Sequence, residues 1–153
     1  MNLTHPLAVD TWGAEERAAV MAVLESEHVT MWTKTLEFED AFARRLGVAH
    51  AVMVNSGSSA NLIAVAAMEQ ALRRQGRTLR GKVAIVPAIA WATTYAPLHQ
   101  HGMRLRVVDI DIDTLNINHL GVWKALCPDT AIVVAANILG NPCDLKPLRW
   151  MCE

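Results

Sequence analysis

The sequence has few cysteines, only one tyrosine and two phenylalanines, and no excess of charge of either sign. Its cysteines, Cys127, Cys143 and Cys152, are odd in number and show no CxxC spacing, which excludes a disulfide framework and disfavours a zinc site. We therefore expect no metal and a reducing, cytoplasmic setting. The 14 Lys and Arg residues nearly balance the 15 Asp and Glu residues, which argues against nucleic-acid binding and against a polybasic membrane anchor, since both require a concentrated basic face.

Two long stretches without charge, residues 46–68 and 83–103, are each long enough to cross a bilayer. Both are interrupted, the first by the polar residues 55–59 and the second by Pro87 and the segment 93–101. Irregular backbone is not tolerated where it would face lipid. We therefore interpret both stretches as buried core elements and expect no membrane association.

Apolar periodicity predicts two helices and then an alternation of strands and helices. The helices are expected at 13–27, 36–46, 58–75, 91–101, 119–126 and 145–153, and the strands at 49–54, 82–86, 104–109 and 131–136. This alternation is typical of a parallel sheet covered by helices, and the continuous apolar runs in the strands indicate burial on both faces. The fold class is α/β, with an N-terminal helical segment at 1–47 and the α/β domain at 48–153.

The segment Ser56-Gly57-Ser58-Ser59 follows one predicted strand and opens an alanine-rich helix. Backbone N–H groups at a helix N-terminus attract anions, Gly57 permits close approach, and the hydroxyls of Ser58 and Ser59 add donors. A phosphate monoester would fit, although simple N-capping by serine explains the pattern equally well. Neither GxGxxG nor GxxxxGK[ST] occurs, so dinucleotide or Walker-type triphosphate binding is not supported.

Trp91 follows the next predicted strand, where ligands bind in open α/β sheets. Its indole could stack on a planar ring or could be an ordinary core aromatic, and the sequence pattern does not separate these alternatives. The alternating residues Asp109, Asp111 and Asp113 could ligate a metal, but we expect them to be turn and N-cap carboxylates.

Five stretches of the chain, in order, resemble the DegT/DnrJ/EryC1/StrS sugar aminotransferases. They are 38–43 (FEDAFA), 50–62 (HAVMVNSGSSANL), 86–94 (VPAIAWATT), 108–117 (VDIDIDTLNI) and 139–144 (LGNPCD). The resemblance implies the fold of aspartate aminotransferase (fold type I) and pyridoxal 5′-phosphate (PLP) as the cofactor. Residue by residue, Gly57, Ser58 and Ser59 fall on the family's phosphate-binding turn, and Trp91 falls where an aromatic side chain stacks on the pyridine ring.

The resemblance also implies an activity, which is transfer of an amino group from glutamate or glutamine to a nucleotide-linked keto-sugar. Such enzymes serve the biosynthesis of cell-surface polysaccharide or of secondary metabolites, and they work as homodimers. A sugar 3-dehydratase of the same family, in which histidine replaces the Schiff-base lysine, is the alternative. A catalytically inactive truncated or split product is a further one.

Two departures from the family pattern bear on these expectations. Trp32 stands where the family usually has glycine, near the substrate loop. The family's ring-nitrogen aspartate and Schiff-base lysine are expected beyond Glu153, and none of the four lysines lies in a matching segment. We therefore interpret the chain as the front part of the PLP-binding domain, assign it no catalytic residue, and expect it to be inactive alone.

Overall fold

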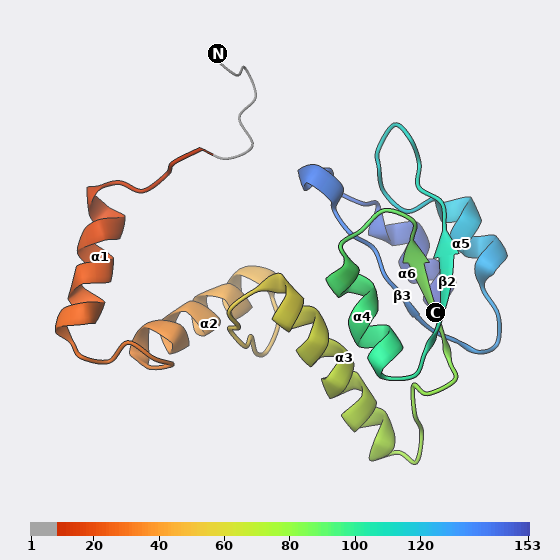
Figure 1. Ribbon diagram of the computed structural model, residues 1–153, viewed down its shortest axis with the longest axis horizontal. Helices are drawn as coiled ribbons and strands as arrows, with labels where there is room; N and C mark the ends of the chain where they lie inside the picture. The colour runs from red at the N-terminus through yellow and green to blue at the C-terminus, as the bar shows by residue number, and fades with distance from the viewer. Residues whose placement is uncertain (1–8) are drawn as a thin grey trace. The chain divides into compact units, whose positions relative to one another are not determined.

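The computed structural model describes residues 9–153, and the chain divides after Met53 into two compact units. The first unit contains helices α1 (Ala14–Glu25) and α2 (Thr33–Leu46) (Figure 1). The N–H of Gly13 donates to the Glu16 carboxylate at 2.7 Å and caps α1. Gly47 ends α2 at φ 68°, in the left-handed conformation that glycine adopts readily at a helix C-terminus.

The second unit alternates strands and helices. Its elements are α3 (Gly57–Arg73), β1 (Val83–Pro87), α4 (Ala92–Gln100), β2 (Arg104–Val108), α5 (His119–Ala125), β3 (Thr130–Val133), the short 3₁₀-helix η1 (Ile138–Gly140) and α6 (Leu145–Cys152). The three strands are parallel in the order β2-β1-β3. This arrangement confirms the predicted α/β class.

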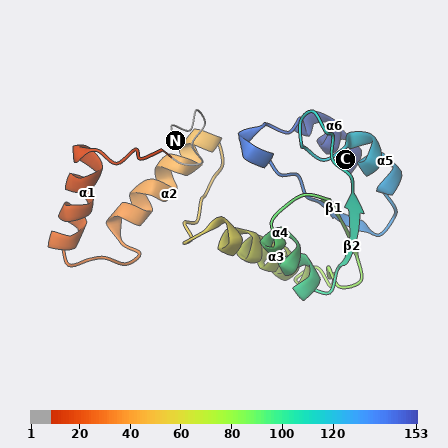
Figure 2. The same cartoon turned by 45° about the horizontal axis from the view of Figure 1, so that its top comes forward.

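Strand β1 is buried along its whole length, and its alternating side chains build two cores. Val83 and Ile85 point to a cluster that includes Val122 of α5 and Leu148 of α6. The side chains at 84 and 86 pack on the opposite face with Leu98 of α4 and parts of α3. Figure 2 shows the two helix pairs on opposite sides of the sheet. The alternation matches a strand that is covered on both faces.

The strand predicted at 49–54 is absent from the structure. Residues 51–54 have no regular secondary structure. A strand exists only through pairing with a neighbour, and the sheet of the described residues consists of β1, β2 and β3 alone. The composition of this segment favours a strand, but the prediction of a strand at 49–54 is wrong for this structure.

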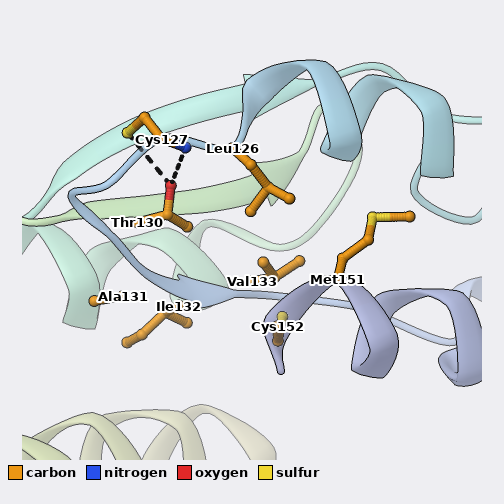
Figure 3. Close-up of a pocket in the computed structure, with 8 residues that line it drawn as sticks. All are labelled: Leu126, Cys127, Thr130, Ala131, Ile132, Val133, Met151 and Cys152. Atoms are coloured by element: carbon orange, nitrogen blue, oxygen red, sulfur yellow. Dashed lines mark hydrogen bonds between the residues drawn. The ribbon is translucent and has the colours of Figure 1, made fainter.

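Strand β3 ends at Val133, three residues earlier than predicted. An apolar cavity of about 380 Å³ lies between β3 and the end of α6. Figure 3 shows that Thr130 accepts a hydrogen bond from the N–H of Cys127 (3.0 Å) at one end of this cavity, while Met151 and Cys152 form the opposite wall. None of the predicted site residues lines it.

Within residues 9–153, no helix combines the length and the hydropathy that a membrane crossing demands.

Candidate functional site

The first turn of α3 is capped by Ser56, which lies just outside the helix. Its side-chain oxygen accepts from the N–H of Ser59 at 3.2 Å, and its hydroxyl donates to the Ser59 oxygen at 3.3 Å. N-capping thus explains Ser56 and does not explain Ser58 or Ser59, which stand inside the helix. Capping and phosphate binding were equal alternatives for these serines on sequence alone, and in the structure the capping serine is Ser56.

The same turn presents unused hydrogen-bond donors. No atom of residues 9–153 accepts a hydrogen bond from the N–H of Gly57 or Ser58. Within that range, no heavy atom beyond the local backbone lies within 4 Å of the point where a Cβ would stand on Gly57. Because α3 is 17 residues long, its N-terminus carries a substantial positive partial charge. The turn therefore has the donors, the field and the space that a phosphate dianion requires.

Trp91 is 84% exposed and precedes the first residue of α4. The interpretation as a core aromatic is therefore wrong. The loop that carries Trp91 is anchored at both sides, since the N–H of Ala88 donates to the carbonyl of Val108 at 2.8 Å and the Tyr95 hydroxyl donates to that of Pro87 at 2.8 Å. A large aromatic face is thus held in solvent on a fixed backbone, as ring stacking requires.

Helices α3 and α4 meet at their first turns. The hydroxyl of Ser58 donates to Thr93 Oγ1 at 3.0 Å, and the Asn61 amide donates to the carbonyl of Thr93 at 3.5 Å. A pocket of about 210 Å³ lies between the helices and includes Ser58, Ser59 and Thr93 in its lining. This contact places the first turn of α3 beside the helix that follows Trp91. Neither Thr93 nor Asn61 was predicted from the sequence to contribute to this contact.

Two of the three alternating aspartates, Asp109 and Asp111, accept hydrogen bonds from nearby backbone N–H groups, as expected of turn carboxylates. One Asp111 oxygen accepts from the N–H groups of Asp113 (3.1 Å) and Thr114 (3.0 Å) and from the Thr114 hydroxyl. The hydrogen bond from the Thr114 N–H is the main reason that the pKa of Asp111 lies below its usual value. Asp109 accepts from the N–H of Ile110 at 2.8 Å. These bonds are typical of turn carboxylates.

Trp32 precedes α2 in the first unit and is 58% exposed. Its indole stacks on the His28 ring with centroids 5.2 Å apart. Where the family usually has glycine, this chain therefore carries a tryptophan that stacks on His28. Nothing in the structure explains this substitution.

The four lysines lie outside α3 and α4. Lys82 pairs with Asp129 at 3.1 Å just before β1, at the opposite end of the strand from Trp91. Lys34 pairs with Glu37 at 2.6 Å in α2, and the other two lysines are in α5 and α6. None of them belongs to α3 or α4.

A family model described as the DegT/DnrJ/EryC1/StrS aminotransferase family matches residues 10–153. This chain belongs to that family. The expected resemblance and its fold type I architecture are thereby confirmed, and the family is PLP-dependent, as the sequence predicted.

Two curated relatives are GDP-4-keto-6-deoxy-D-mannose 3-dehydratases. The protein of Escherichia coli O55:H7 (strain CB9615 / EPEC) is 42% identical over 92% of this chain and 36% of its own length. The protein of Yersinia pseudotuberculosis is 38% identical over 99% of this chain and 38% of its own. The chain thus spans less than two fifths of either relative.

A solved structure agrees with these relatives. It is a GDP-4-keto-6-deoxymannose-3-dehydratase with a trapped PLP-glutamate geminal diamine. The match has a TM-score of 0.88 at 40% identity and covers 97% of this chain and 38% of that one. The donors of the Gly57–Ser59 turn and the exposed indole of Trp91 fit the phosphate and the ring of PLP, respectively.

Proposed function

We propose that this chain supplies the phosphate-binding and ring-stacking part of a PLP-dependent enzyme that catalyses 3-dehydration of a GDP-linked 4-keto-6-deoxy sugar. The observation that carries the proposal is the identity of 42% and 38% to two such 3-dehydratases over nearly the whole chain. The proposal replaces amino transfer, our main expectation from the sequence, by its stated alternative.

The phosphate contacts follow from the first turn of α3. The N–H groups of Gly57 and Ser58 point out of the helix end, and the hydroxyls of Ser58 and Ser59 stand beside them. The Ser59 oxygen already accepts from Ser56, so its own hydrogen remains available for an anion. These donors are fixed by helix geometry and by the Ser56 cap, and little ordering is needed when the phosphate binds.

Trp91 supplies the second contact. Its exposed indole lies on the anchored loop between β1 and α4 and can cover one face of a planar ring. When bound, PLP supplies the electron sink for bond cleavage at the sugar. The contribution of these residues is to hold the phosphate and the ring in a defined orientation and to exclude water from one ring face.

The remaining participants belong to the same proposal. The sugar nucleotide would carry GDP, as in the names of the relatives, and the amino donor would be glutamate or glutamine. The assembly would be a homodimer. Neither the first turn of α3 nor the first turn of α4 contains a lysine or a histidine, so we assign no proton-transfer group to these turns.

Binding of a PLP analogue to the 153-residue chain tests the proposed role in cofactor binding. The probe is 4-deoxypyridoxine 5′-phosphate, which has the ring and phosphate of PLP but no aldehyde to react with lysines. Its unphosphorylated counterpart is the control. Because charge-assisted hydrogen bonds contribute about 1.5–3 kcal/mol each, we expect a preference of at least about tenfold for the phosphorylated probe. Equal affinity for both probes would refute the assignment of phosphate binding to the turn at residues 57–59.

Isotope labelling tests the reaction class with the protein expressed from the complete reading frame. The mixture contains PLP, GDP-4-keto-6-deoxymannose and ¹⁵N-glutamate. Dehydration removes the oxygen at C3 of the sugar and leaves no nitrogen on it, whereas amino transfer keeps that oxygen and places ¹⁵N on the sugar. Mass spectrometry of the sugar nucleotide separates the two outcomes, and a ¹⁵N-labelled sugar that retains its C3 oxygen would restore the aminotransferase interpretation.

A further inference from the structure

The contact between Ser58 and Thr93 joins two hydroxyl groups, each of which can donate or accept. The oxygens are 3.0 Å apart, and the residues lie in the first turns of α3 and α4. A hydroxyl has one hydrogen, so only one member of the pair donates to the other at a given moment. The direction of this bond decides whether the hydrogen of Ser58 points at Thr93 or is available to an anion at the turn.

The two side chains differ in rigidity. Serine has three staggered χ1 rotamers of similar energy, and Ser58 is exposed, so neighbouring packing does not select one. Threonine is β-branched and restricted at χ1 within a helix. The only side-chain partner of Ser58 among residues 9–153 is Thr93, which therefore selects the rotamer of Ser58.

We propose that Thr93 is a positioning residue for cofactor binding, because its hydroxyl donates to Ser58 Oγ when the turn is occupied and directs the Ser58 hydrogen into the turn. The inference rests on the proposed phosphate-binding function and adds a residue to it. Thr93 acts through Ser58 and needs no direct contact with the ligand. The lining of the pocket between α3 and α4 by both residues agrees with this arrangement.

The structure also separates this role from general support of the helix junction. The Asn61 amide reaches the backbone carbonyl of Thr93, not its side chain. Replacement of Thr93 by the isosteric valine removes the hydroxyl pair and leaves the Asn61 contact in place. Thr94, the next residue, is half-buried, and none of the side-chain hydrogen bonds within residues 9–153 involves its hydroxyl. Thr94→Val is therefore the matched control.

The experiment measures dissociation constants of the 153-residue chain for 4-deoxypyridoxine 5′-phosphate and its unphosphorylated counterpart by isothermal titration calorimetry. One hydrogen bond is at stake, so Thr93→Val should weaken binding of the phosphorylated probe roughly 3- to 10-fold and leave the other probe unchanged. Thr93→Ser should recover the affinity to within about twofold, and Thr94→Val should match the original chain. Each variant is first checked for an unchanged unfolding midpoint.

A double substitution tests whether Thr93 acts through Ser58. In the Ser58→Ala background, Thr93→Val should produce no further loss, since its partner is already gone. An equal loss in both backgrounds would overturn the proposal. Normal affinity of Thr93→Val beside weakened Ser58→Ala would overturn it while leaving the proposed function intact. If the unsubstituted chain does not prefer the phosphorylated probe, the proposed function fails and this inference fails with it.

Discussion

The carboxylate of Glu69 accepts a hydrogen bond from the backbone N–H of Leu79 at 2.7 Å, and both residues are buried. They lie ten positions apart in the sequence. The same carboxylate also accepts from the Thr78 hydroxyl (2.9 Å) and from Arg73 (2.7 Å). Glu69 is in the last third of α3, and Leu79 belongs to the loop that leads into β1. This buried carboxylate therefore fixes α3, whose other end carries the proposed phosphate-binding turn (residues 57–59), to the loop that leads into the central strand.

The first prediction concerns acid stability. The Leu79 N–H and then Arg73 lower the pKa of Glu69 from 4.5 to about 2. A group whose pKa is depressed by folding stabilises the folded state above its unfolded pKa, and this contribution is lost as the pH falls through the folded pKa. We therefore expect the unfolding free energy, measured by urea titration, to be level above pH 5 and to decline between about pH 4.5 and pH 2.

Glu69→Gln should be less stable than the original chain near pH 7 and should lose most of the decline below pH 4.5. Glu37→Gln is the control, because Glu37 forms an exposed pair with Lys34 and such pairs contribute about 0–1 kcal/mol. A Glu69→Gln chain whose acid profile parallels that of the original would show that another group controls the decline.

The second prediction concerns packing under α5. A Cβ on Gly121 would stand 2.5 Å from Val108 Cγ1, in the core beneath the helix. Overpacking of this kind costs about 1–3 kcal/mol, whereas alanine gains up to about 1 kcal/mol over glycine from helix propensity. Gly121→Ala should therefore lower the urea midpoint. The loss should shrink in a Val108→Ala background, where the opposing methyl group is absent, and an undiminished loss there would exclude the clash as its cause.

Much of the fold could be predicted because its signals are local. The apolar runs of β1 and β3 and the left-handed glycine that ends α2 are visible within a few residues of sequence. The segment 49–54 shows the limit of this approach. Its composition favours a strand, but strand formation depends on a partner, and within residues 9–153 none lies beside it.

The candidate site shows the same division. Gly57, Ser58, Ser59 and Trp91 could be proposed from the sequence because each occupies a recognisable position relative to a helix start. The role of Ser56 as the cap could not be separated from that of its neighbours, because several serines in a row satisfy the same pattern. The contact between Thr93 and Ser58 could not be predicted, because the two residues lie 35 positions apart and only folding brings them together.

The third prediction concerns the two serines of the phosphate turn. Ser58→Ala/Ser59→Ala removes two hydroxyl donors, each worth about 1.5–3 kcal/mol toward a dianion. Affinity for 4-deoxypyridoxine 5′-phosphate should fall by one to several orders of magnitude, whereas affinity for the unphosphorylated probe should not change. Ser26→Ala is a suitable control, since Ser26 ends α1 in the other unit. An unchanged affinity in the double variant would refute the assignment of this turn.

The last prediction concerns Trp91, one of five tryptophans in the chain. If its indole stacks on the pyridine ring, the phosphorylated probe should quench part of the tryptophan fluorescence, and Trp91→Phe should remove most of that quench while largely keeping the affinity. Trp91→Ala should remove the quench and also weaken binding, because aromatic stacking contributes about 0.5–1.5 kcal/mol beyond area burial. The pair of variants separates the optical signal from the contact that produces it.

Trp123 and Trp150 stack on each other at 5.7 Å between α5 and α6, so Trp123→Phe measures any quench that originates elsewhere. A quench that persists in Trp91→Phe but disappears in Trp123→Phe would place the ring against the opposite face of the sheet and away from α3.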